Sequence, residues 1–138
     1  MFMLTVLGVL LVATMIYWFI EWFNAYAQKE GNYHFFSAEH TMAFVASYLI
    51  IFFGYRLMEN HWMGDALNGG IILVIGISIL VFTILNNFKS TKRSLAIKGT
   101  VAQLILYIPI AAVGLLILVA AFAFFSQTKP VYNINSND

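Results

Sequence analysis

The segment EWFNAYAQKEGNYHFFSAEHTM, residues 21–42, holds the densest group of acid–base and metal-binding side chains in the chain. Histidine and glutamate together can bind zinc or manganese, so a metal or catalytic site is one interpretation of this segment. The spacing matches no catalytic metal motif, because Glu39 and His40 are adjacent and point in different directions on a helix. The weak metal candidates are Glu21, Glu39 and His40. We expect no catalytic residue and no cofactor.

The same segment also fits an ordinary turn between two membrane helices. Ser37 is a favourable N-cap, and Glu39 in the following turn complements the positive N-terminus of a helix. Aromatic residues around the turn are typical of the belt that membrane proteins place at the headgroup level. These are Tyr17, Trp18, Trp22, Tyr26, Tyr33, Phe35 and Phe36. Whether the segment is a site or a turn depends on whether Glu21, Glu39 and His40 converge.

The composition indicates a membrane protein. Of 138 residues, 62% are hydrophobic and 9% charged, whereas soluble domains carry about 25% charged residues. Four apolar stretches are each long enough to cross a hydrocarbon core of about 30 Å: 2–23, 41–58, 69–88 and 100–125. We therefore expect an all-α integral membrane four-helix bundle, with helices over about 2–23, 36–58, 69–88 and 92–125. Residues 1–138 would form one polytopic domain, and 126–138 its polar tail.

Several functions are disfavoured by what the chain lacks. There is no cysteine, which removes disulfides, thiolate metal sites and covalent haem attachment. The stretches 69–88 and 100–125 contain no Asp, Glu, His, Lys or Arg, so a transporter that uses a carboxylate at the membrane centre is disfavoured. The net charge of +1 gives no reason to expect a nucleic-acid partner.

A second polar turn, ENHWMGDALNGG, covers residues 59–70. Arg56 and Glu59 are three residues apart and should pair on one helix face. His61 with Glu59 and Asp65 is a possible ion site. A solvated turn with an interfacial tryptophan is the commoner meaning of such a sequence.

Basic residues predict the orientation in the membrane. Five of them belong to the connections after the first and third helices, whereas Arg56 and Lys129 belong to the other side. We therefore expect a bacterial inner membrane protein with both termini outside and the first and third connections in the cytoplasm. The basic third connection should contact anionic lipid headgroups or a cytoplasmic protein partner. Its residues are Lys89, Lys92, Arg93 and Lys98.

Small residues mark where helices can approach closely in lipid. One such seam is predicted on each of the last three helices, for packing within the chain or for a homo-oligomer. The seams are Ala43, Ser47 and Gly54; Gly69, Gly76 and Thr83; and Ala111, Gly114 and Ala121. Pro109 removes one backbone hydrogen bond from the fourth helix and should kink it, either as a gating hinge or as packing geometry.

These observations favour a non-enzymatic membrane subunit that self-associates and anchors or signals to a cytoplasmic partner. The first alternative is a small oligomeric channel or membrane-permeabilising effector, for example of a bacterial defence or toxin system. Its pore would be lined by Gln103 and by Asn86 or Asn87, and gated near Pro109. The second alternative is an accessory subunit of a respiratory or transport complex.

Overall fold

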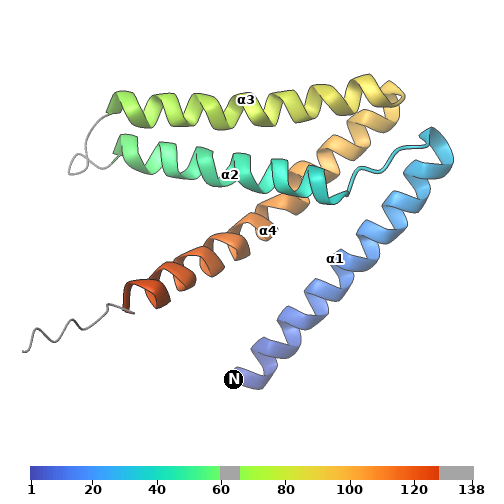
Figure 1. Ribbon diagram of the computed structural model, residues 1–138. Helices are drawn as coiled ribbons and strands as arrows, with labels where there is room; N and C mark the ends of the chain where they lie inside the picture. Colours follow the sequence, from blue (N-terminus) through green and yellow to red (C-terminus); the bar gives the residue numbers. More distant parts are fainter. Residues whose placement is uncertain (60–65, 128–138) are drawn as a thin grey trace, which may run out of the picture.

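A computed structural model describes residues 1–59 and 66–127 of the chain. Over these two ranges the chain forms four helices and no strand, which confirms the predicted all-α fold (Figure 1). Each helix is long and apolar enough to span a membrane, so the fold is that of a multi-pass membrane protein. The helices are α1 (Phe2–Gly31), α2 (Ala38–Glu59), α3 (Ala66–Ser90) and α4 (Arg93–Gln127).

The first helix continues well past the end predicted from its apolar run. Phe23 and Ala27 lie one turn apart and are both buried, so the added turns pack against the rest of the chain. The helix stops at Asn32, which adopts the left-handed conformation (φ 51°, ψ 44°) and donates its backbone N–H to the carbonyl of Gln28 at 3.0 Å. Asparagine tolerates this conformation better than most residues. The connection to α2 therefore consists of residues 32–37 and is shorter than the apolar runs predict.

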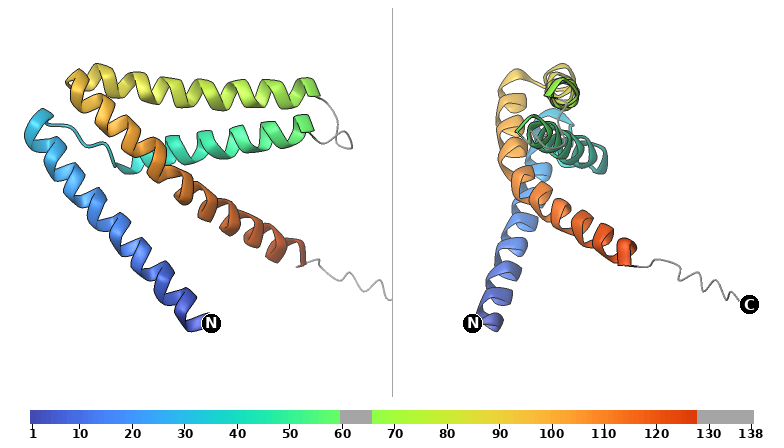
Figure 2. Two further views of the ribbon diagram at one scale, coloured as in Figure 1. Left: turned by 180° about the vertical axis from the view of Figure 1, so that it is seen from behind. Right: turned by 90° about the vertical axis from the view of Figure 1, so that its left-hand side faces the viewer.

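The closest helix pair is α2 and α3, which lie side by side as an antiparallel hairpin (Figures 1 and 2). Its contact is made by glycines. A Cβ added to Gly54 would lie 2.6 Å from the backbone nitrogen of Leu73, and one added to Gly69 would lie 2.8 Å from that of Met58. Gly76 is equally restricted. The two backbones are therefore closer than any side chain would allow, and the seam predicted on α3 meets α2 of the same chain.

The other small residues of the predicted seams differ in their surroundings. Ser47 and Thr83 are buried, and each hydroxyl donates to a carbonyl of its own helix. On α4, Ala111 is buried, whereas Ala121 is exposed. Ala43 and Gly114 are partly buried. Most of the predicted small-residue positions therefore pack within one chain.

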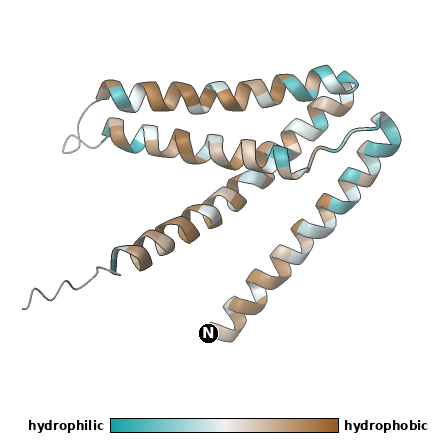
Figure 3. Ribbon diagram, in the orientation of Figure 1, coloured by the Kyte–Doolittle hydropathy of each residue, from teal (hydrophilic) through white to brown (hydrophobic). Residues whose placement is uncertain are grey.

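The first helix stands apart from the other three. Over the two described ranges, the backbone of α1 approaches that of α4 but not that of α2 or α3. Every residue from Met1 to Met15 is exposed. The helix diverges from α4 toward its N-terminus in both views of Figure 2. Figure 3 shows that polar residues gather near the junction of α1, α3 and α4, while the diverging parts of α1 and α4 are mostly apolar.

Pro109 lies inside α4, as the sequence requires, and the helix changes direction along its length in the right-hand view of Figure 2. A proline at this position leaves the carbonyl of Ile105 without its usual N–H donor. The neighbouring carbonyl of Leu104 accepts a hydrogen bond from the Tyr48 hydroxyl at 2.9 Å. A side chain of α2 thus supports the backbone of α4 where the helical hydrogen bonding is weakened.

Candidate functional site

The connection between α1 and α2 folds into the chain instead of lying on its surface. Phe35 is fully buried in a cluster with Phe23, Ala27 and Leu95. Its ring lies directly against Gly99 of α4, where an added Cβ would overlap the ring. The ring of Phe23 meets it edge-on, with 5.7 Å between the centroids. Glycine is therefore required at position 99 for the connection to dock on α4.

A buried polar network ties this connection to α3 and α4. The Tyr33 hydroxyl donates to Oδ1 of Asn87 at 2.9 Å. The Asn87 amide in turn donates to Oε1 of Gln103 at 2.6 Å and to the hydroxyl of Thr100 at 3.2 Å. The Gln103 amide donates to the backbone carbonyl of Phe35. Asn87 and Gln103 are completely buried. We call Tyr33, His40, Asn87, Thr100 and Gln103 the polar network.

His40 joins the polar network to the start of α2. Its Nε2 lies 2.9 Å from the Tyr33 hydroxyl, and its Nδ1 lies 2.7 Å from the Ser37 hydroxyl. Since Tyr33 already donates to Asn87, it accepts from His40, which assigns the ring proton to Nε2. Nδ1 then accepts from Ser37. The Ser37 oxygen also accepts the backbone N–H of His40 at 3.3 Å, which confirms the predicted N-cap.

Two further hydrogen-bonded pairs surround the polar network. Asn24 of α1 bonds both the backbone N–H and the carbonyl of Phe36, at 3.0 and 3.1 Å. Thr41 of α2 lies 2.8 Å from the hydroxyl of Tyr107 on α4. Burial raises the pKa of the Tyr33 hydroxyl above its ordinary value of 10.0, so this group remains a neutral donor near neutral pH. The junction is thus held by neutral hydrogen bonds from all four helices.

No protein family model, curated protein or solved structure matches this chain. Its function is therefore argued from its own geometry.

The three weak metal candidates do not converge. Glu21 and Glu39 are exposed, whereas both ring nitrogens of His40 are engaged by Tyr33 and Ser37. Because α1 continues to Gly31, about 15 Å of helix separates Glu21 from the connection to α2. In the part of the chain that the structure describes, no three His, Asp or Glu residues are placed to share a metal ion.

The predicted pore residues are also placed differently from one another. Asn86 is exposed, while Asn87 and Gln103 are buried and bond to each other. A pore lined by the buried pair would require the polar network to break. The sequence held a signal for the buried arrangement. Thr100, Gln103 and Tyr107 lie at positions i, i+3 and i+7, on one face of α4.

The aromatic residues near the connection serve two different purposes. Trp18 and Trp22 are exposed on α1, as expected for an interfacial belt. Phe35 is fully buried, so including it in the belt was wrong. Tyr33 is partly buried. Their neighbours had suggested an exposed turn, but the glycine at position 99 gives Phe35 a place inside the chain.

The charged residues of the predicted contacts are exposed. Those of the basic third connection lie at the end of α3 and the start of α4: Lys89, Lys92, Arg93 and Lys98. At the C-terminal end of α2, Arg56 pairs with Glu59 at 3.3 Å, as the spacing predicts. The proposed ion site with His61 and Asp65 lies outside the described residues.

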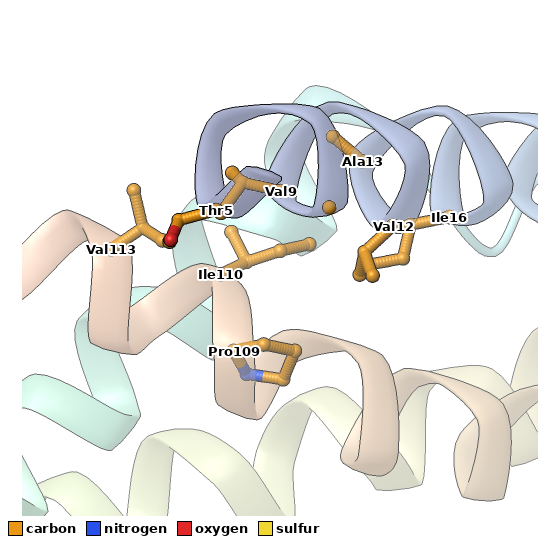
Figure 4. A pocket seen from close by; sticks show the side chains of 9 residues that line it. Thr5, Val9, Val12, Ala13, Ile16, Pro109, Ile110 and Val113 are labelled. Carbon is orange, nitrogen blue, oxygen red and sulfur yellow. The ribbon is translucent and has the colours of Figure 1, made fainter. Parts of the chain in front are cut away.

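A second feature is an apolar cleft of about 660 Å³ between α1 and α4. Figure 4 shows Val9, Val12 and Ile16 of α1 on one side, with Ile110 and Val113 of α4 on the other. Small residues widen the α1 side, since Gly8 and Ala13 also line the cleft. Apart from its chain neighbours and the backbone of its own helix, no atom of the described residues lies within 4 Å of the position that a Cβ on Gly8 would occupy. The cleft therefore has room for apolar groups from outside the chain.

The N-cap of α2 can be tested by replacing Ser37 with alanine. The change removes the acceptor for the His40 N–H and the partner of its Nδ1. We expect Ser37→Ala to lower the free energy of unfolding by about 1–2 kcal/mol, measured by denaturant titration in detergent micelles. Ser37→Thr keeps the hydroxyl and should stay close to the parent. Equal losses for both variants would show that the hydroxyl contributes little.

Proposed function

We propose that this chain is a non-enzymatic, multi-pass membrane subunit that assembles with other transmembrane helices through α1, with a second copy of the chain as the first candidate. The observation that carries the proposal is the separation of α1 from the other helices. Its first half is exposed on every side, and it borders an apolar cleft with α4. The remaining helices have extensive partners within the chain.

Packing in lipid favours this use of α1. Between apolar helices in a bilayer there is no hydrophobic force, so association depends on close packing at small residues. The glycines of the α2–α3 hairpin already face one another's backbones. Gly8 has no such neighbour, although it lies on the cleft side of α1. A helix from another chain would find at Gly8 the kind of contact that the hairpin makes internally.

A channel or permeabilising effector receives less support from the geometry. The side-chain amides that would line its pore belong to Asn87 and Gln103. They form hydrogen bonds with each other and with the α1–α2 connection. An oligomeric pore would have to be lined by other, mostly apolar residues. An accessory role in a respiratory or transport complex is a special case of the subunit proposal.

The proposed orientation follows from the basic residues. Five basic residues lie at the ends of the helices that the α1–α2 and α3–α4 connections join, and they favour an orientation with this end on the cytoplasmic side of a bacterial inner membrane. The termini would then lie outside. This end would also be the surface for a cytoplasmic protein partner, which supports a subunit that anchors or signals.

Cysteine crosslinking tests association through α1, because the natural chain contains no cysteine. Gly8→Cys places a thiol on the cleft side of α1, and Leu7→Cys places one on the opposite side. Both residues are exposed within the chain. After oxidation in native membranes, we expect several-fold more crosslinked product from Gly8→Cys than from Leu7→Cys.

The identity of the crosslinked product is then read by mass spectrometry, as a second copy or another membrane protein. Equal, low yields from both variants, together with a monomer of unchanged mass in mild detergent, would contradict the proposal.

A further inference from the structure

A stack of aromatic and basic side chains lies where α1 and α4 come together. The rings of Trp22 and Tyr26 on α1 are stacked and nearly parallel, with 6.0 Å between ring centroids and 10° between ring planes. Lys98 of α4 places its Nζ over the Tyr26 ring, 6.0 Å from the centroid. This is within the range of a cation–π contact. The stack thus joins α1 and α4 where they come together. Toward the N-terminus of α1 the two helices diverge.

The position of the stack along α1 corresponds to the lipid headgroups. Trp22 lies at the end of the apolar run of α1, and tryptophan and tyrosine are enriched where the hydrocarbon core meets the headgroups. Because Lys98 contacts Tyr26, its ammonium group lies at the same level. Lys29 lies seven residues after Trp22 and three after Tyr26, so it shares their face of α1. Two cations from two helices therefore flank one aromatic stack.

Neither lysine is neutralised within the described residues, where the one ion pair is that of Arg56 with Glu59. The carboxylate of Glu30 is on the same face of α1 as Tyr26 but is within 4.0 Å of neither ammonium group. Two cations at headgroup level with no paired carboxylate are complementary in charge to a phosphate.

The surface beyond the stack suits the rest of a phospholipid. Ile16 is ten residues before Tyr26 on α1, and Pro109 is eleven residues after Lys98 on α4. These separations correspond to about 15 Å of helix, which is the depth of one leaflet of the hydrocarbon core. An acyl chain that starts at the stack therefore ends where the apolar cleft begins, since Ile16 and Pro109 line the cleft.

We infer that Lys98, Lys29, Tyr26 and Trp22 form a binding site for one anionic phospholipid, with its phosphate between the two lysines and an acyl chain along α1 and α4. This inference goes beyond association through α1 and does not depend on it. Binding at this site differs from the general attraction of anionic lipids to the α3–α4 turn. The site combines an aromatic surface with cations that come from two helices.

Fluorescence quenching by brominated lipids tests the site. A Trp18→Phe, Trp62→Phe variant retains Trp22 as the single tryptophan. It is reconstituted in phosphatidylcholine vesicles that contain equal small fractions of brominated phosphatidylglycerol or brominated phosphatidylcholine. We expect the anionic lipid to bind near Trp22 about fivefold better than the zwitterionic lipid, the factor that a single lysine at an anionic surface contributes.

Charge variants in this background locate the effect. Lys98→Gln should remove most of the preference, Lys98→Arg should retain it, and Glu30→Gln should increase it. Lys89→Gln is the matched control, since Lys89 is exposed at the end of α3 and has no aromatic ring beneath it among the described residues. An equal loss for Lys89→Gln and Lys98→Gln would mean a diffuse attraction and would overturn the site. The absence of any preference for the anionic lipid would also overturn the site. The same holds if neither lipid quenches Trp22, because a protein would then cover it.

Discussion

Gly69→Ala is expected to destabilise the α2–α3 hairpin, although alanine is the better helix former. The added methyl carbon would lie 2.8 Å from the backbone nitrogen of Met58 and 2.9 Å from the carbonyl oxygen of Gly54. Backbone atoms cannot turn aside as a side chain can, so α2 and α3 must separate. Overpacking of this kind costs about 1–3 kcal/mol, against a gain of up to about 1 kcal/mol in helix propensity.

The measurement is the free energy of unfolding in mixed micelles, with far-ultraviolet circular dichroism as the readout. Gly70→Ala is a matched control on the adjacent residue, where an added Cβ meets nothing within 4 Å. It should leave stability unchanged or raise it slightly. If Gly69→Ala is as stable as Gly70→Ala, the close approach of the two backbones is not a source of stability.

The sequence predicted the helices well because the relevant property is simple. A run of about 20 apolar residues must form a helix in a bilayer, since no water is present to satisfy the backbone. The glycine spacing on α3 likewise predicted a packing face. It could not say whether that face meets the same chain or another one, because small residues make the same contact in both cases.

The end of α1 was harder to predict. Residues 24–31 are polar enough to read as a loop, and hydropathy alone ends the helix at Phe23. The helix continues because Ala27 packs into the junction and Asn32 supplies the left-handed residue that ends it. This extension moves Glu21 away from Glu39 and His40. The metal interpretation depended on a distance that hydropathy does not determine.

The partners within the polar network could not be predicted from the sequence, for a related reason. Under the channel alternative, the sequence predicts a pore lined by Gln103 and by Asn86 or Asn87. The actual partners of Asn87 and Gln103 are each other, Tyr33 and the carbonyl of Phe35. Those partners belong to a connection between helices, whose path follows from tertiary contacts and not from periodicity. A buried amide in a membrane helix needs a hydrogen-bond partner, which is either water in a pore or another buried group.

Asn87 is the centre of this network, since it accepts from Tyr33 and donates to Gln103 and Thr100. Leucine has the same branched shape, a larger volume and a higher helix propensity, so Asn87→Leu removes the hydrogen bonds without leaving a cavity. The Tyr33 hydroxyl and the Gln103 carbonyl oxygen would both lose partners. An unsatisfied buried polar group costs about 1–3 kcal/mol, although single hydrogen bonds between membrane helices average about 0.6 kcal/mol.

We therefore expect Asn87→Leu to lower the free energy of unfolding by roughly 2–4 kcal/mol, measured in the same mixed micelles. Because the α1–α2 connection is held to α3 and α4 by this residue, proteolysis within residues 32–37 should also become faster. Asn86→Leu is the matched control on the adjacent, exposed residue and should change stability by less than about 0.5 kcal/mol. If the two variants have the same stability and the same cleavage rate, the polar network does not hold the connection in place. A loss of stability without faster cleavage would instead mean that Asn87 joins α3 to α4 alone, and that Phe35 on Gly99 is enough to dock the connection.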